Sequence, residues 1–325
     1  MKRIITAAAL AVTAAVVLTG CGTTEATSST SSSTAGAITI TDATGTKVHL
    51  DGPATKVVGT EWNVVEDLVA LAVQPVGVAD PKGYGNWDTA APLTGSPKEI
   101  GTRGEPSTDT IASLAPDLIV ATTDLSAATL EQLRAIAPVV AVRSADASHQ
   151  IEQMTTDLDM IAKATGRQQQ AAKVMDRFHD AVAAGKEAIT KAGLAGDDFA
   201  FADGYEVSNQ VTIRPYADGS LIGDVTEELG LHNAWDVTGD GSYGLGSTDV
   251  EGLTKLPSDV QFLYLANDAD GGDVFTSALG SNAVWKSLPF VAAGHVHRLH
   301  DGIWLFGGPA SMTAYVHAVV AALTK

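Results

Sequence analysis

The chain has 325 residues, enough for one large domain or two ordinary ones. Hydrophobic residues make up 45% and charged residues 18%, so most of the chain is expected to fold around a core. Acids outnumber bases by 38 to 20, which argues against nucleic-acid binding because such proteins gather Lys and Arg to release counterions. The single Cys excludes a disulfide framework and a cysteine-based zinc site.

The first 20 residues have the features of an export signal, with the bases Lys2 and Arg3 followed by an apolar run and small residues. The segment Leu18-Thr19-Gly20-Cys21 resembles the bacterial lipobox, in which the Cys becomes the lipidated first residue of the mature protein. We therefore expect a signal peptide at 1–20 and a lipid on Cys21. This lipid would hold the protein extracytoplasmically, on the outer face of the cytoplasmic membrane or in the periplasm. Residues 21–37, mostly Ser, Thr and Ala, are expected to form a flexible tether.

Residues 38–166 alternate between predicted strands and predicted helices. A hairpin is expected around Thr44-Gly45, and Ser107 and Ser126 have the position of helix N-caps. Buried strands are predicted at 56–59, 75–78, 117–120 and 139–142. Strands that alternate with helices favour a parallel sheet with helices on both faces.

A long helical stretch is predicted from 151 to 190, and Gly193 and Gly196 end it. The strand and helix alternation then restarts. Strands are predicted at 198–202, 261–265 and 295–300, and helices at 220–229 and 309–323. The sequence thus predicts an α/β fold of two Rossmann-like lobes with parallel sheets, at 38–166 and 191–325, joined by one long helix at 167–190. A ligand cleft is expected between the lobes, because open α/β sheets bind ligands beyond the carboxyl ends of their strands.

Aromatic residues and arginines follow several predicted strands. Four of the five Trp residues, Trp235 among them, lie at or near predicted loops. Loop aromatics can simply pack the domain, but together they favour an aromatic cleft for a large, semi-apolar ligand. The planar guanidinium group of arginine offers several N–H donors that suit anionic oxygens. The candidate ligand-binding residues are Trp62, Tyr84, Trp87, Arg103, Tyr205, Arg214, Tyr243, Trp304 and Phe306.

The order of these motifs resembles the substrate-binding lipoproteins of bacterial iron–siderophore ABC importers, most closely the ferric-hydroxamate branch. The resemblance covers roughly residues 38 to 325. The segments that carry it are Val57-Val58-Gly59-Thr60-Glu61-Trp62, Ile100-Gly101-Thr102-Arg103, Ala115-Pro116-Asp117-Leu118-Ile119, Asn233-Ala234-Trp235, Ser242-Tyr243-Gly244, Leu288-Pro289-Phe290-Val291 and Ile303-Trp304-Leu305-Phe306-Gly307.

The resemblance implies a monomeric receptor that binds a ferric siderophore and delivers it to an ABC permease. It implies ligand contacts from Arg103, Trp62, Trp87, Tyr243 and Trp304. It also implies that acidic residues on each lobe, at the positions of Asp109 and Glu251, pair with permease arginines. One departure concerns Thr122-Thr123-Asp124-Leu125, where the hydroxamate branch places a Tyr. Iron(III) would arrive already chelated, so the resemblance requires no cofactor and no direct metal ligand.

Charge favours a neutral or cationic hydroxamate over an anionic ferric catecholate. A tris-catecholate should need several bases, whereas the cleft is expected to offer Arg103, with Arg214 or Lys82. The acidic chain should also repel anions at long range. Haem and a corrinoid are the other ligands considered.

Two further motifs and one enzyme alternative bear on the function. Gly239-Asp240-Gly241-Ser242-Tyr243-Gly244 matches the dinucleotide fingerprint, but no clear strand precedes it, so a loop is predicted. His295 and His297, with His300 nearby, are placed on the solvent side of a strand and lack a carboxylate partner for a metal. An extracytoplasmic lipoprotein hydrolase is the enzyme alternative, although no nucleophile elbow occurs.

Overall fold

A computed structural model describes residues 36–208 and 210–324. The predicted signal peptide, Cys21 and all but the last two residues of the predicted tether lie outside the described residues. Within the described part of the chain, none of the helices combines the length and apolar character needed to cross a membrane.

The first sheet has five parallel strands in the order β5-β4-β3-β6-β7. The strands are β3 (Val57–Gly59), β4 (Gly77–Val78), β5 (Lys98–Glu99), β6 (Leu118–Thr122) and β7 (Val139–Val142). The predicted hairpin is formed by β1 (Ile38–Thr41) and β2 (Lys47–Leu50), which pair antiparallel. The apolar residues of β3, β6 and β7 are buried on both faces, as expected for parallel strands covered by helices.

Helices α1 (Trp62–Ala70), α3 (Thr108–Leu114) and α4 (Ala127–Arg134) form at the predicted places. Ser107 accepts the N–H of Thr110 at 3.3 Å, and Ser126 accepts the N–H of Thr129 at 3.1 Å. Both serines are therefore N-caps, as predicted. An additional helix, α2 (Pro81–Trp87), follows β4 where only a loop was expected.

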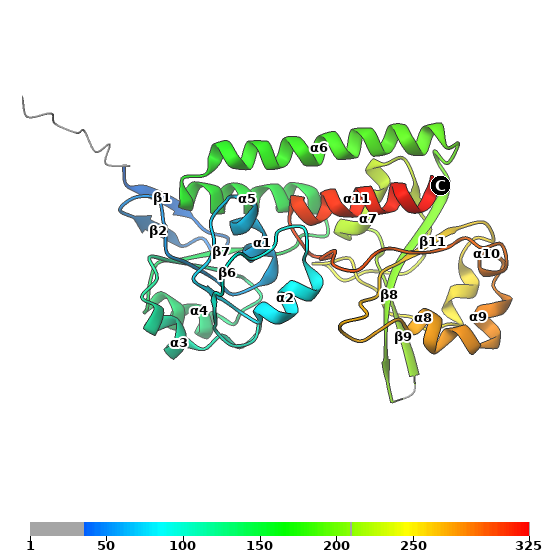
Figure 1. Ribbon diagram of the computed structural model, residues 1–325, viewed down its shortest axis with the longest axis horizontal. Coiled ribbons are helices and arrows are strands. Elements are labelled where there is room, and N and C mark those ends of the chain that lie inside the picture. The colour runs from blue at the N-terminus through cyan, green and yellow to red at the C-terminus, as the bar shows by residue number, and fades with distance from the viewer. Residues whose placement is uncertain (1–35, 209, 325) are drawn as a thin grey trace, which may run out of the picture. The chain divides into compact units, whose positions relative to one another are not determined.

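The long helical stretch consists of two helices, α5 (Gln150–Thr165) and α6 (Gln168–Lys191). The break lies at Gly166, whose φ of 68° ends α5 in the left-handed conformation that glycine adopts readily. Helix α6 packs alongside α5 and the terminal helix α11 (Pro309–Leu323), and all three run along one side of the two sheets (Figure 1).

The second sheet contains the parallel strands β10 (His232–Asn233), β8 (Asp198–Val207), β11 (Gln261–Tyr264) and β12 (Val296–Arg298), in that order. Helix α7 (Leu221–Glu228) is capped by Ser220. The predicted parallel sheet is present, and β9 (Gln210–Pro215) adds an antiparallel strand that pairs with β8. The polar residues and glycine at 203–206 conceal the extension of β8 beyond the predicted strand.

Short helical segments that were not predicted complete this half of the chain. They are two 3-10 turns (Gly252–Lys255 and Leu279–Ser281) and the helices α8 (Val274–Ser277), α9 (Ala283–Ser287) and α10 (Pro289–Ala292).

The largest core cluster joins the two halves. It contains Val57 and Val120 from the first sheet, Phe178 from α6, Phe199 from the second sheet and Tyr315 from α11. Separate clusters cover the remaining face of each sheet. The two sheets therefore share one continuous apolar core beneath α5, α6 and α11.

Candidate functional site

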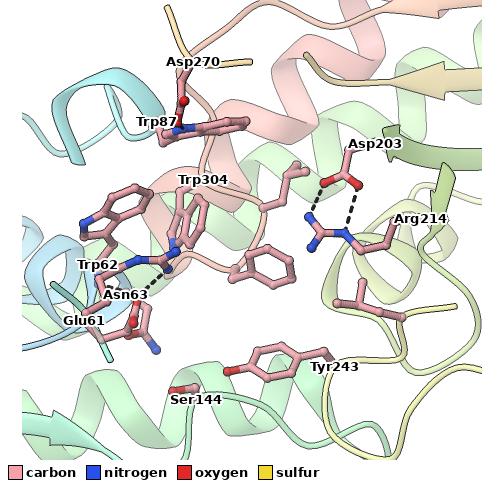
Figure 2. A pocket seen from close by; sticks show the side chains of 14 residues that line it. Glu61, Trp62, Asn63, Trp87, Ser144, Asp203, Arg214, Tyr243, Asp270 and Trp304 are labelled. Atoms are coloured by element: carbon pink, nitrogen blue, oxygen red, sulfur yellow. Dashed lines mark hydrogen bonds and ion pairs between the residues drawn. The ribbon is translucent and has the colours of Figure 1, made fainter. Parts of the chain in front are cut away.

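A cavity of about 440 Å³ lies among the ends of strands from both sheets (Figure 2). From the first half of the chain, Glu61 and Trp62 follow β3, Arg103 follows β5 and Ser144 follows β7. From the second half, Asp270 follows β11 and Trp304 follows β12. The other lining residues are Asn63, Trp87, Asp203, Arg214, Tyr243, Leu245, Leu305 and Phe306. The position of the cavity agrees with the rule for open α/β sheets.

Three indoles form one wall of this cavity. The Trp304 ring meets Trp62 edge-on, with centroids 4.8 Å apart, and meets Trp87 at 6.2 Å. Phe306 continues the wall at 5.1 Å from Trp304. Trp62 Nε1 donates to the Ala79 carbonyl at 3.2 Å, whereas Trp304 Nε1 is buried and has no hydrogen-bond partner among the described residues. The Trp304 N–H is thus an unsatisfied donor, but its nitrogen is not exposed to the cavity.

Arg103 lies against this aromatic wall. Its Cζ atom is 4.1 Å from the centroid of Trp62 and 5.1 Å from that of Trp304. Its Nη1 donates to Glu61 Oε1 at 2.9 Å, and the same carboxylate oxygen accepts the Trp62 N–H at the start of α1. The side chain remains 38% exposed, so most guanidinium donors are available to a ligand.

Arg214 is the second guanidinium of the cavity, and Asp203 on the neighbouring strand pairs with it in a bidentate contact. The distance from Arg214 Nε to Asp203 Oδ1 is 2.9 Å, and the Tyr216 hydroxyl donates to Asp203 Oδ2 at 3.2 Å. Burial lowers the pKa of Arg214, but Tyr216 and Asp203 more than offset this, so the net pKa is raised. Arg214 therefore stays charged.

Tyr243 comes from the loop that matched the dinucleotide fingerprint. Asp240 holds this loop by accepting the N–H groups of Ser242, Tyr243 and Leu245 at 2.8, 2.7 and 3.1 Å. No helix begins there, so the loop prediction was correct. The Tyr243 hydroxyl donates to Asp124 Oδ2 at 2.6 Å. Asp124 lies in the segment where the hydroxamate branch was expected to carry a Tyr, and here it accepts a hydrogen bond from a tyrosine in a loop of the second half of the chain.

Two of the predicted ligand residues lie outside the cavity. Tyr84 is fully buried within α2, and its hydroxyl donates to the Ala91 carbonyl, so the prediction that it contacts ligand was wrong. Tyr205 lies on β8, is 49% exposed and is not among the lining residues. Lys82 is exposed on α2 and does not line the cavity either. Trp235 is a packing residue whose indole donates to the Phe201 carbonyl at 2.8 Å.

The three histidines near β12 lie outside the cavity as well. His295 and His297 are half-buried rather than on the solvent side. His297 Nε2 contacts Gln261 Oε1 at 2.8 Å, and His300 Nδ1 contacts the Asp301 carbonyl at 2.9 Å. Among residues 36–208 and 210–324, no group of three or more His, Cys, Asp or Glu side chains is arranged to hold a metal ion.

The sequence pattern of the family described as periplasmic binding protein matches residues 57–302. The chain belongs to this family. Among its relatives is YhfQ of Bacillus subtilis (strain 168), which is named as an ABC transporter substrate-binding lipoprotein and is 29% identical over 263 residues, 77% of each chain.

A second relative of this periplasmic binding protein is the iron(3+)-hydroxamate-binding protein FhuD of Escherichia coli (strain K12). It is 26% identical over 269 residues, 81% of this chain and 85% of its own. A solved structure of the siderophore binding protein FhuD from Vibrio cholerae, bound to Fe3+-Desferal, has a TM-score of 0.70 at 24% identity. The alignment covers 83% of this chain and 98% of that one.

Several lining residues of this periplasmic binding protein were not predicted from its sequence. They are Glu61, Asn63, Ser144, Asp203, Leu245, Asp270 and Leu305. Glu61 could have been found, because it lies beyond the end of the predicted strand 56–59 and directly precedes the candidate Trp62. Asp203 was hidden because the predicted strand ended at residue 202.

The two candidate docking acids are both exposed. Asp109 lies in the first turn of α3, and Glu251 directly precedes the 3-10 turn Gly252–Lys255. Asp109 can also stabilise its helix by the favourable interaction of an acid with a helix N-terminus.

Proposed function

We propose that this periplasmic binding protein is a lipid-anchored receptor that captures a ferric siderophore and delivers it to an ABC permease, without reacting with it. The observation that carries the proposal is the cavity lining. Three indoles, Phe306 and Tyr243 face the same space as the guanidinium groups of Arg103 and Arg214. Aromatic faces suit the apolar arms of a chelator, and the guanidinium groups suit its iron-bound oxygens.

The charge of the lining supports a neutral or cationic hydroxamate. Arg103 and Arg214 are already paired with Glu61 and Asp203, and Asp270 adds a third carboxylate at the cavity. A triply anionic chelate would have to displace these pairs and approach uncompensated acids. The relative FhuD of Escherichia coli, named for iron(3+)-hydroxamate binding, is consistent with this choice. Iron(III) is then part of the cargo, and no cofactor is required.

The lining also favours binding over hydrolysis. It includes Ser144 and Asp203 but no histidine, so a Ser-His-Asp triad is not assembled among the described lining residues. The family is one of binding proteins. A hydrolase would therefore have to build its catalytic base elsewhere.

In this proposal residues 1–20 direct export, Cys21 carries the lipid, and residues 21–37 tether the body to the membrane. Residues 38–166 and 191–325 are the lobes of a monomer, and 167–190 is the helix that connects them. The lipoprotein name of the relative YhfQ supports the anchor.

The ligand is tested by quenching of tryptophan fluorescence. A neutral ferric tris-hydroxamate should quench saturably at submicromolar to micromolar concentration, and a ferric tris-catecholate, haem and cobalamin should bind far more weakly. Tight binding of the catecholate, haem or the corrinoid with no hydroxamate binding would overturn the ligand class. Turnover of an ester or peptide substrate would overturn the binding role.

Delivery is tested with the exposed acids Asp109 and Glu251. The double variant Asp109→Lys with Glu251→Lys should keep its siderophore affinity but lose uptake in cells, because permease arginines would meet lysines. The control reverses the charge of Glu131, an exposed acid on α4. Uptake at the wild-type rate by the double variant at normal abundance would reject these two residues as docking sites.

A further inference from the structure

Three carboxyl groups meet one helical turn behind the cavity. Glu66 and Asp67 belong to α1, and Asp88 directly follows α2. Their exposed fractions are 0%, 3% and 1%. One oxygen of each, Glu66 Oε2, Asp67 Oδ1 and Asp88 Oδ2, faces no N–H donor in the described part of the chain, and a protonated Asp88 can donate a hydrogen bond to Glu66. Buried carboxyl groups without a base are costly when charged, so their presence calls for an explanation.

The three carboxyl groups lie directly against the backbone that leads from the cavity into α11. Glu66 Oε1 accepts the N–H of Ser311, in the first turn of α11, at 2.7 Å. A Cβ atom placed on Gly307 would lie 2.2 Å from Glu66 Oε2, and one on Gly308 would lie 2.3 Å from Asp67 Oδ1. The two glycines therefore let the backbone lie directly against the carboxyl groups.

This segment connects the cluster to the aromatic wall. The Gly307 N–H donates to the Trp304 carbonyl at 3.1 Å, which closes a turn over Trp304, Leu305 and Phe306. All three of these residues line the cavity. At its other end, α1 begins with Trp62 and Asn63, which also line the cavity. Glu66 thus joins two cavity-lining segments that are far apart in the sequence.

The surrounding charges indicate which group is ionised. Burial raises the pKa of Glu66, but the Ser311 N–H offsets part of the rise. Burial raises the pKa of Asp67 well above its usual range, and repulsion by Glu66 adds to it; the same causes raise the pKa of Asp88. Glu66, whose carboxylate accepts an N–H at the start of α11, is thus the first to ionise, while Asp67 and Asp88 keep their protons.

The other titratable groups packed here are acidic as well. Tyr84 of α2 has its pKa raised by burial and by Asp88, and Asp157 of α5 has its pKa raised to about 8 by burial. Helix α11 contributes the Ser311 N–H, and its His317 is exposed and forms no ion pair with the three carboxyl groups. No Lys, Arg or His within the described ranges forms an ion pair with Glu66, Asp67 or Asp88.

We propose that Glu66 is a positioning residue, whose contact with the start of α11 fixes Trp304 and Phe306 in the cavity. A test of this inference by ligand affinity rests on the proposed function, whereas a test by amide hydrogen exchange does not. As pH rises, Asp67 and Asp88 lose their protons and place additional carboxylates next to Glu66. The contact between Glu66 and the start of α11 should therefore weaken as pH rises.

The first experiment compares Glu66→Gln with Glu66→Leu. Gln keeps an oxygen that can accept the Ser311 N–H, whereas Leu has a similar volume and no acceptor. Glu66→Leu should weaken binding of a ferric tris-hydroxamate about tenfold, and Glu66→Gln should largely restore the affinity at neutral pH. Leu253→Ala, in the core of the second half, serves as a destabilised control that should keep its affinity. Equal affinities for Gln and Leu variants that both fold would overturn the proposal.

The second experiment needs no ligand. Amide hydrogen exchange at Gly307 and Ser311, corrected for the intrinsic rate, should be faster in Glu66→Leu than in Glu66→Gln. In the wild type it should accelerate as pH rises, and Asp88→Asn, which cannot ionise, should reduce that acceleration. Exchange rates that depend neither on pH nor on the residue at position 66 would contradict the positioning role of Glu66. If the wild type binds no hydroxamate but shows this exchange pattern, only the proposed ligand is rejected.

Discussion

Arg103 combines two roles that a lysine could not combine. Its planar guanidinium stacks against Trp62 and Trp304, and one of its nitrogens is held by Glu61. The side chain is consequently oriented before any ligand arrives, which lowers the entropy lost on binding. Its free N–H groups are then available to iron-bound oxygens.

Arg103→Ala should weaken binding of a ferric tris-hydroxamate by about 10- to 100-fold, because a charge-assisted hydrogen bond contributes about 1.5–3 kcal/mol. Fluorescence titration measures the effect. Arg143→Ala is the matched control, since Arg143 is exposed, pairs with Asp146 and does not line the cavity. An unchanged dissociation constant in a folded Arg103→Ala protein would make Arg103 a structural residue.

Glu61 is expected to determine which charge the cavity accepts. Glu61→Gln keeps an acceptor for the Trp62 N–H but removes the negative charge that Arg103 faces. Affinity for an anionic ferric chelate should rise by several-fold relative to a neutral one, and the gain should shrink with added salt. Glu99→Gln changes an exposed acid outside the cavity and should leave this ratio unaltered. A ratio equal to that of the wild type in Glu61→Gln would show that Glu61 has no part in selectivity.

At the scale of elements, the contact between α1 and the start of α11 decides how the cavity wall is held. Gly307 and Gly308 precede α11, and Gly308 has an extended backbone with φ of −85°. An alanine would therefore be conformationally permitted there. What excludes it is space, because its Cβ would lie 2.3 Å from Asp67 Oδ1.

Gly308→Ala should accordingly destabilise the protein by about 1–3 kcal/mol through overpacking, measured by urea unfolding. Combining it with Asp67→Ala frees the space and should recover part of the loss, so the two changes should be non-additive. Gly280→Ala is the control, because the nearest atom to its added Cβ is 3.9 Å away. If the two changes in the free energy of unfolding simply add up in the double variant, a short contact with Asp67 is not the reason why alanine is unfavourable at position 308.

At the scale of the whole molecule, buried acids make stability depend on pH. Asp157 of α5 is 5% exposed, and burial raises its pKa to about 8, although Gln153 donates to it at 2.8 Å. The folded state thus holds a proton that the unfolded chain releases near pH 4. Stability from this group is present at low pH and is lost as pH rises through about 8.

The urea midpoint of the wild type should therefore fall between about pH 5 and about pH 8. Asp157→Asn keeps an oxygen for Gln153 and cannot ionise, so it should flatten this dependence and be the more stable protein at the higher pH. Asp159→Asn is a suitable control, since Asp159 is exposed on the same helix. A steeper decline in Asp157→Asn than in the wild type would contradict a raised pKa at Asp157.

The sequence by itself determined the elements whose signals are local. Apolar runs at residues 118–120 and 139–142 predicted buried strands, and Ser107 and Ser126 marked helix starts, because a strand period or a capping side chain acts over a few neighbouring residues. The rule that ligands bind beyond strand ends then placed Trp62, Trp87, Arg103, Tyr243 and Trp304 around one cavity.

Only the tertiary structure decided which side chains face that cavity and which are buried. Tyr84 turns into the core because the unpredicted helix α2 rotates it inward. From the sequence, Glu66 cannot be distinguished from an exposed acidic residue of a helix. In the structure it contacts Ser311, which lies 245 residues further along the chain. Such contacts depend on how distant elements pack, and no local pattern of residues encodes the burial of a carboxyl group against the start of another helix.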